Sequence, residues 1–226
     1  MSESPPESAA NKPPSGAPAE PIGAEVSRAV PKPGETVRTI APPSGPTEPP
    51  PPEGLVLPPF IVGLQAAVPD AVEHVSWWVG DWSVVVRTSR LVEAAAHLRA
   101  APGAVFDLCS DVTAVDWPPR PLRFDLIYSL SSISLGHRLR LKVRVGDGDA
   151  VPTVSSVWPA AVWLEREVFD LFGIRFDGHP DLRRILMPEE WQGHPQRKDY
   201  PLEGPGEMLM ENPMDWLRVR RAEDIE

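Results

Sequence analysis

Apolar and polar positions repeat with different periods along the chain, and these periods predict which segments form strands and which form helices. Over residues 124–130 and 139–145 every second residue is apolar, a period of two that is typical of strands with one buried face. A further strand is expected over 104–112, before the first of these segments. This part of the chain is therefore expected to contain three consecutive strands.

Two more strands are expected earlier in the chain. Residues 75–79 and 82–86 are rich in Val and Trp and flank the dipeptide Gly80-Asp81. A Gly-Asp pair between two such runs is typical of a two-residue hairpin turn. The sequence therefore predicts a β-hairpin, whose tryptophans pack in the core or against another subunit.

Two helices complete this region. A short helix is indicated at Pro69, and apolar residues every three or four positions over 91–98 predict a second helix that Thr88 or Ser89 caps. The elements then follow in the order α-β-β-α-β-β-β. This order predicts an α+β domain over 60–154, with two layers and a mixed, mostly antiparallel sheet that has helices on one face.

The first 59 residues differ from this domain in composition. They hold 17 of the 30 prolines, with Ser, Glu, Gly and Ala between them and no long apolar run. Such a segment buries too little apolar surface to offset the entropy of ordering. Residues 1–59 are therefore expected to form a disordered, locally polyproline-II extension, and binding to a neighbouring subunit is the functional alternative.

The stretch over 163–202 is denser in charged and large apolar side chains than the rest of the chain, and its first part predicts a helix. The apolar stripe of this helix comprises Leu164, Val168, Leu171 and Phe172. Gly173 follows at once and is expected to end the helix in the left-handed conformation. Glu165, Glu167 and Asp170 lie off the stripe, as does Arg166, which is spaced to pair with Asp170 at i,i+4.

Beyond this helix the sequence predicts few regular backbone hydrogen bonds. A short extended segment is expected over 174–176, and His179 and His194 each stand between a glycine and a proline. A residue before proline is disfavoured in helical conformation. Residues 155–204 are therefore expected to form a helix followed by an extended strap, and residues 205–226 a C-terminal tail.

Within this stretch the sequence closely resembles a known signature. The segments that carry the resemblance are ERE at 165–167, DLFGI at 170–174, GHPDLRRIL at 178–186 and RKDYP at 197–201, with DVTAVDW at 111–117 upstream. They resemble the C subunit of respiratory NADH:quinone oxidoreductase (complex I) of the bacterial type, without gaps in spacing through Leu186. The resemblance covers roughly residues 60–204.

The resemblance implies that the stretch forms contacts between subunits. Its mixture of apolar residues with Arg, Asp and His is typical of a large specific interface, and the sequence holds no nucleophile elbow, glycine-rich phosphate loop or HExxH motif. No catalytic, cofactor-binding or metal-binding residue is therefore assigned. The residues assigned to the signature and interface are Glu165, Arg166, Glu167, Asp170, Phe172, Gly173, His179, Pro180, Asp181, Arg183, Arg184, His194, Arg197, Lys198, Asp199 and Tyr200.

The composition of the chain disfavours several classes of function. A net charge of −10 and a pI near 5.0 disfavour nucleic-acid binding, which needs a basic face. No apolar run approaches the ~20 residues of a membrane helix, and the N-terminus has no signal-peptide pattern, so membrane contact is expected only through partners. The single cysteine, Cys109, cannot by itself hold an iron–sulfur cluster or a structural zinc ion, which need about four ligands.

The resemblance implies a cofactor-free structural subunit in the peripheral arm of the proton-translocating complex, on the cytoplasmic side of the cell membrane. Neighbouring subunits would carry FMN and iron–sulfur clusters, and electrons would pass from NADH to quinone beside this chain. Its partners would be chiefly the D subunit, together with the B and I subunits. The electron donor and the quinone type stay open.

Two other functions also stay open. The equivalent scaffold subunit of a membrane-bound hydrogenase, or of another complex I-like assembly, would share the ERE and GHPDL elements. A stand-alone metal-dependent hydrolase would use Glu165, Asp170, His179 and His194 as acid, base or metal ligands.

A row of basic residues is the last feature that the sequence leaves open. The basic stripe consists of Arg138, Arg140, Lys142 and Arg144, which alternate with the apolar residues of the predicted strand over 139–145. Four positive charges on one face of an acidic protein either dock an acidic neighbour or form a solvated face.

Overall fold

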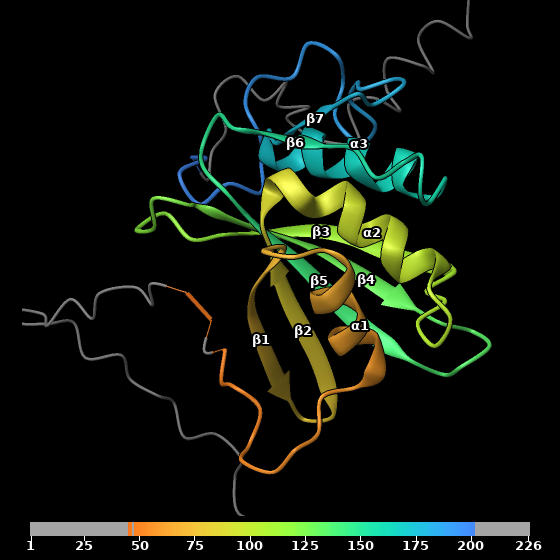
Figure 1. Ribbon diagram of the computed structural model, residues 1–226. Coiled ribbons are helices and arrows are strands. Elements are labelled where there is room, and N and C mark those ends of the chain that lie inside the picture. Colours follow the sequence, from red (N-terminus) through yellow and green to blue (C-terminus); the bar gives the residue numbers. More distant parts are fainter. Residues whose placement is uncertain (1–44, 47, 202–226) are drawn as a thin grey trace, which may run out of the picture. The chain divides into compact units, whose positions relative to one another are not determined.

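The computed structural model describes residues 45–46 and 48–201 (Figure 1). Contacts along the chain separate two units, Met1–Ala41 and Pro42–Glu226, and every described residue belongs to the second unit. The expectations for residues 1–44 of the extension and for the tail over 205–226 fall outside the described residues.

A five-stranded sheet forms the centre of the described part, with its strands in the order β1-β2-β5-β4-β3. The strands are β1 (Val72–Trp78), β2 (Asp81–Val86), β3 (Leu108–Asp116), β4 (Phe124–Ser131) and β5 (Arg138–Val145). β2 and β5 pair in parallel, and every other neighbouring pair is antiparallel. The prediction of a mixed, mostly antiparallel sheet is confirmed, and β5 is the middle strand.

Three helices cover one face of this sheet (Figure 1). They are α1 (Pro59–Ala67), α2 (Leu91–Ala100) and α3 (Ala161–Phe172), and a 3-10 helix, η1 (Thr88–Arg90), leads into α2. The order of helices and strands as far as β5 is the predicted one, so the two-layer α+β architecture is confirmed. No helix of the described part is both long and apolar enough to cross a membrane.

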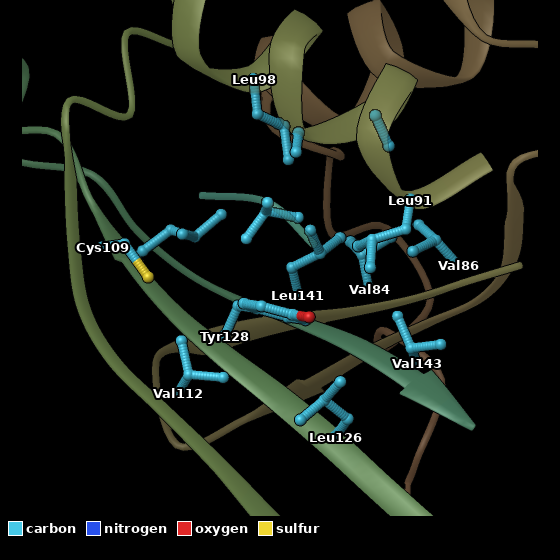
Figure 2. Close-up of a cluster of buried hydrophobic side chains, with 14 of the residues drawn as sticks. Val84, Val86, Leu91, Leu98, Cys109, Val112, Leu126, Tyr128, Leu141 and Val143 are labelled. Atoms are coloured by element: carbon cyan, nitrogen blue, oxygen red, sulfur yellow. The ribbon is translucent and has the colours of Figure 1, made fainter. Parts of the chain in front are cut away.

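The alternating residues of the strands and the apolar stripes of the helices meet in one core (Figure 2). Val84 of β2, Leu126 of β4, Leu141 of β5 and Leu98 of α2 are all 0% exposed. Removing each of these side chains from water stabilises the fold by roughly 1.5–3 kcal/mol. Helix α3 packs on β3 and adds Phe172 to the same core, so the signature helix completes the helical layer.

The first helix lies earlier in the chain than predicted. α1 starts at Pro59, where the missing N–H of proline suits a helix start, and ends at Ala67, before the start expected at Pro69. Asp70 has a φ of 60°, which a right-handed helix excludes. The prediction that Thr88 or Ser89 caps the second helix is also wrong. Both residues belong to η1, and α2 begins without a side-chain cap.

The β1–β2 hairpin is confirmed, but its turn is Val79-Gly80 rather than Gly80-Asp81. Both turn residues have positive φ, 49° for Val79 and 90° for Gly80, as a type I′ turn needs. Asp81 instead begins β2, opposite Trp78. A β-branched residue such as Val79 is strained at positive φ and is unusual in such a turn. The residue types therefore favoured Gly80-Asp81, one position later than the observed turn.

The strand predicted over 104–112 begins four residues later, as β3, because residues 104–107 close the end of α2. The N–H group of Phe106 donates to the carbonyl oxygen of Leu98 at 3.0 Å, and the indole N–H of Trp158 donates to the Phe106 carbonyl at 2.8 Å. These bonds use backbone groups that a strand would need for pairing.

A second, two-stranded sheet joins the loop after β5 to the signature stretch. β6 (Ala150–Pro152) pairs in parallel with β7 (Arg175–Asp177). The extended segment expected over 174–176 is confirmed, one residue later, as β7. Its partner β6 was not predicted, since three residues are too few to show a period.

Candidate functional site

Helix α3 carries three charged side chains into the interior. Glu165, Arg166 and Asp170 are 0%, 6% and 0% exposed, although they lie off the predicted apolar stripe of the helix. Their partners lie on the loop before α3 and on the strap after it, and both segments cover the helix. The predicted helix end is confirmed, because Gly173 has a φ of 79°.

The Asp170 carboxylate holds the strap against the end of α3. It accepts hydrogen bonds from the backbone N–H groups of Ile185, Leu186 and Met187 at 3.0, 2.7 and 2.8 Å, and from Arg184 Nη1 at 2.6 Å. Burial alone would raise the pKa of Asp170, but these four donors outweigh it and hold the pKa below its ordinary value. Asp170 is therefore a satisfied buried anion.

Arg184 extends this network along the strap. Its Nη2 donates to the carbonyl oxygens of Trp191 and Gly193 at 2.9 and 3.0 Å, while Nη1 binds Asp170. Arg184 thus pairs with a carboxylate of the helix. Because one guanidinium joins three segments, its loss would release more than one contact.

The ring of His194 closes the end of the helix. Its Nδ1 lies 2.8 Å from the Asp170 carbonyl oxygen, so this nitrogen donates to the helix end. A Cβ atom on Gly173 would lie 2.6 Å from Cδ2 of this ring, closer than real contacts allow. Glycine is therefore required at position 173 both for its positive φ and for the approach of His194.

Arg166 binds backbone rather than a carboxylate of its own helix. Its Nε and Nη2 donate to the carbonyl oxygens of Arg183 and Arg184 at 3.1 and 2.9 Å, and its guanidinium stacks over the Trp163 ring at 5.1 Å. Asp181 lies 3.9 Å away. The predicted i,i+4 pair with Asp170 does not form, because Asp170 turns to the strap.

Glu165 lies in the first half of α3 with fewer donors. Oε1 accepts the N–H of Val154 at 2.9 Å, and Oε2 shares a hydrogen bond with the Thr153 hydroxyl. Burial raises the pKa of Glu165 to about 7, and these two bonds oppose it only in part. Burial likewise raises the pKa of the nearby Cys109 thiol to about 12, so this cysteine stays protonated.

His179 stands beside Glu165 but faces backbone atoms. Nε2 lies 4.0 Å from Glu165 Oε2 and donates to the Val162 carbonyl oxygen at 3.0 Å, while Nδ1 accepts the N–H of Asp181 at 3.1 Å. Both ring nitrogens are therefore engaged. Within residues 45–46 and 48–201, no three His, Cys, Asp or Glu side chains are placed to hold a metal ion.

The four residues of the metal-hydrolase hypothesis therefore do not form one site. Glu165 and His179 meet near the start of α3, whereas Asp170 and His194 meet at its end. The Asp170 carboxylate has its four donors already. No described geometry brings the two groups together.

A second network fastens the end of the strap to the main sheet. Arg123 binds both carboxylate oxygens of Asp116 at 2.6 Å and Asp199 at 2.9 Å. The backbone N–H of Lys198 also donates to Asp116, at 2.7 Å. Burial alone would raise the pKa of Asp116, but Arg123 and this N–H hold it below its ordinary value.

Arg197 strengthens the second network from the strap side. It donates to Asp147 at 3.0 Å and to Asp199 at 3.3 Å. Its guanidinium and that of Arg123 lie over the Phe124 ring at 5.3 and 5.1 Å. The RKDYP segment is therefore bound within the chain itself, to residues of the β3–β4–β5 region.

The remaining signature residues divide between interior and surface. Phe172 is buried, and Tyr200 is half-buried, where its ring would lie 3.0 Å from a Cβ on Gly193. The exposed members are Glu167, Pro180, Asp181, Arg183, Lys198 and Asp199. Beside them, Trp163 is 60% and Leu186 55% exposed, which gives this side of α3 and the strap the mixed character of a binding surface.

Three residues that complete these networks were not expected from the sequence. Arg123 and Asp147 join the RKDYP segment to the sheet, and Thr153 binds Glu165. Arg123 and its partner Asp199 are 76 positions apart. In the sequence these residues appear only as charged or polar residues beside a strand, and this does not indicate which residue each one binds.

The chain resembles known proteins over this same region. Residues 84–206 match the family described as "Respiratory-chain NADH dehydrogenase, 30 Kd subunit". The C subunit of NADH-quinone oxidoreductase from Trichlorobacter lovleyi is 52% identical over 129 residues, which are 56% of this chain and 78% of the relative. The same subunit from Geobacter metallireducens is 46% identical over 148 residues, which are 65% of this chain and 90% of the relative.

A solved structure has a similar fold. It is a chain of the membrane-bound sulfane sulfur reductase, an archaeal respiratory membrane complex, with a TM-score of 0.55 and 26% identity. The similarity covers 63% of this chain and 84% of that chain. The match to the family begins at residue 84, so it leaves the Pro-rich extension, α1 and β1 outside.

Proposed function

The chain belongs to the family of the 30 kDa subunit of respiratory-chain NADH dehydrogenase, and on that premise we propose that it is a structural subunit of the peripheral arm of a NADH:quinone oxidoreductase. It binds no cofactor itself. Neighbouring subunits hold FMN and iron–sulfur clusters, and electrons pass through them from NADH to quinone. The D subunit is the chief partner, with the B and I subunits, and the chain reaches the cytoplasmic side of the cell membrane only through these partners.

One observation carries this proposal: the buried charged residues of the signature are bound within the chain. Asp170 has four donors, Arg166 donates to backbone oxygens of the strap, and Arg184 donates to the Asp170 carboxylate and to backbone oxygens of the strap. Groups held in this way position a surface and are not free to react with a substrate. The surface that they hold carries Trp163, Glu167, Arg183 and Leu186 on its exposed side.

The test separates assembly from turnover. Glu167→Ala and Arg183→Ala change exposed side chains of this surface, and Arg99→Ala changes an exposed Arg on α2 as a matched control. We expect the first two variants to lower the amount of assembled complex on native gels, with NADH:quinone reductase turnover per assembled complex nearly intact. The control should leave both quantities unchanged.

A catalytic role for the signature would give the opposite result. Full assembly with turnover reduced by roughly two orders of magnitude or more would contradict the structural role. Thermal unfolding of the isolated variants shows whether a loss of assembly comes from the surface or from the fold.

A second candidate is the equivalent subunit of another complex I-like assembly, such as a membrane-bound hydrogenase. The similarity to a chain of the sulfane sulfur reductase favours it, because that structure is a respiratory membrane complex with a different named substrate. Mass spectrometry of the proteins that co-purify with the tagged chain decides between them. An NADH-binding flavoprotein among the partners supports the first candidate, and a hydrogenase large subunit supports the second.

A further inference from the structure

The basic stripe lies on the face of the main sheet opposite the three helices. Along β5 the residues from Leu139 to Val145 that alternate with it are buried toward the helices, so the stripe points to the other face. Because β5 is the middle strand, the stripe runs through the centre of this face, here named the uncovered face because no helix of residues 45–46 and 48–201 lies on it. Whether this face is free to bind a partner depends on which groups already bind the stripe.

One residue of the Pro-rich extension occupies half of the stripe. Glu48 Oε1 accepts a hydrogen bond from Lys142 Nζ at 2.8 Å, and Oε2 accepts one from Arg144 Nη2 at 2.7 Å. The side chains of Glu48 and Lys142 are only 11% and 13% exposed. Burial alone would raise the pKa of Glu48, but the two cations outweigh it and hold the pKa below its ordinary value.

The backbone beside Glu48 is bound to the edge strand β1. The His74 ring Nε2 donates to the Glu48 carbonyl oxygen at 3.1 Å, and the N–H of Trp77 donates to the Pro49 carbonyl oxygen at 3.3 Å. β1 is the first strand of the sheet order, so this Trp77 N–H would otherwise face outward from an open edge.

The segment continues on both sides of this contact. Before it, Gly45 lies against Arg120, whose Nη1 would be 3.1 Å from a Cβ at position 45, and Arg120 pairs with Asp125 of β4. After it, the chain runs beside β1 and on to α1, on the helix face (Figure 1). Residues 45–46 and 48–50, the crossing segment, therefore pass over the uncovered face from the β4 side to the β1 edge.

We propose that Lys142 and Arg144 form a carboxylate-binding site whose ligand is this chain's own Glu48, and that the site anchors the Pro-rich extension across the uncovered face. The anchor also covers the edge of β1. It does not depend on assembly into a larger complex, and the extension lies outside the residues that match the family.

The Pro-rich composition favours such an anchor. Pro49 to Pro52 have φ restricted before folding, so fixing this segment costs less conformational entropy than fixing an ordinary chain. Two charge-assisted hydrogen bonds then hold it, of which the bond to Lys142 is the better shielded from water, since the Lys142 side chain is 13% and that of Arg144 34% exposed. Glu53, the next acidic residue, is exposed and offers a matched control of the same charge.

The anchor divides the stripe into two halves. Lys142 and Arg144 are taken by Glu48, whereas Arg138 and Arg140 lie 3.8 and 2.7 Å from Asp81 and stay 78% and 45% exposed. An acidic neighbour therefore meets the Arg138–Arg140 half first. It gains the other half only if Glu48 leaves.

The test uses the full-length chain with Glu48→Gln, and Glu53→Gln as the control. We expect Glu48→Gln to speed hydrogen exchange of the Trp77 amide by about tenfold or more and to raise acetylation of Lys142 several-fold. The control should match the wild type in both. Lys142→Gln with Arg144→Gln should release the Trp77 amide to the same extent, and adding Glu48→Gln should then change nothing further.

Two results would overturn the anchor. Wild-type exchange at Trp77 in Glu48→Gln would show that the crossing segment is held by other contacts. An equal release by Glu53→Gln would show a response to total charge rather than a site.

Discussion

Two carboxyl groups of α3 are both inaccessible to solvent, but their pKa values are shifted in opposite directions. Glu165 and Asp170 are both 0% exposed, five positions apart on one helix. Asp170 receives three backbone N–H groups and an Arg, and its pKa is lowered, whereas Glu165 receives one N–H and a hydroxyl, and its pKa is raised to about 7. Burial raises the pKa of both carboxyls, and the donors decide whether this effect is outweighed, as at Asp170, or opposed only in part, as at Glu165.

The difference gives the two ends of α3 opposite responses to pH. The lowered pKa of Asp170 contributes stability above the unfolded value near 3.8, and that stability is lost as the pH falls through the folded pKa. The raised pKa of Glu165 contributes stability that is full below about 4.5 and is lost as the pH rises through about 7. One end of the helix is therefore weakened by acid and the other by base.

The largest effect is expected from breaking the Asp170 end. Asp170→Ala leaves Arg184 and three backbone N–H groups without their acceptor, and should lower the free energy of unfolding by about 3–5 kcal/mol. Urea unfolding of the isolated chain at pH 7 measures this loss. Asp170→Asn keeps an acceptor oxygen and should cost less, and a loss below about 1 kcal/mol for Asp170→Ala would contradict the role given to this carboxylate.

Gly173→Ala tests the approach of His194 at the same end. The substitution combines strain at positive φ with a contact to the His194 ring that must shift, and should cost about 2–3 kcal/mol. Gly148→Ala is the matched control, because Gly148 has a φ of 85° and nothing within 4 Å of an added Cβ. The control should cost about 1 kcal/mol, from strain alone. Equal losses in the two variants would mean that His194 does not press on residue 173.

Glu165→Gln sharpens the comparison through pH. Gln keeps the shape of the protonated acid but does not titrate, so the free energy of unfolding of the variant relative to the wild type should rise by roughly 2–3 kcal/mol between pH 5 and pH 8. Urea unfolding of both proteins across this range measures the difference, and groups common to both cancel. A constant difference would mean that the pKa of Glu165 is not raised in the fold.

The smallest effect is expected at Arg183. Its side chain is 65% exposed and pairs with Asp181, which is 52% exposed, so Arg183→Ala should change the stability of the isolated chain by less than about 0.5 kcal/mol. Arg184→Ala, one position later, removes the partner of Asp170 and should cost several-fold more. Thermal unfolding of the two variants compares them directly. A large loss for Arg183→Ala would show that this residue serves the fold rather than a partner surface.

The parts of the fold with a regular period were predictable from the sequence. The alternation over 124–130, from which only Ile127 departs, and over 139–145 led directly to β4 and β5, because a buried sheet face needs every second residue apolar. Local exceptions were not predictable in the same way. Val79 at positive φ and the closure of α2 by residues 104–107 depend on contacts that no short sequence window contains.

The features of the candidate site also differ in how far the sequence could predict them. Gly173 was predictable as a helix end, because its residue type alone carries the information. The burial of Glu165 and Asp170 was not, since a charged residue in a helix is ordinarily exposed and the groups that offset its burial lie elsewhere in the chain. Glu48 is the extreme example, because its partner Lys142 is 94 positions away and its own surroundings suggest only disorder.

The parallel pairing of β2 with β5 has a consequence for how the chain folds. The hairpin β1–β2 and the meander β3–β4–β5 each join strands that are close in sequence, whereas Val84 pairs with Leu141, 57 positions later. Closing so long a loop costs entropy before any contact offsets it, so pairs of this kind form slowly. The pairing of β2 with β5 in the middle of the sheet is therefore expected to form last during folding. Substitutions there should mainly speed unfolding, while those within the hairpin or the meander should mainly slow folding.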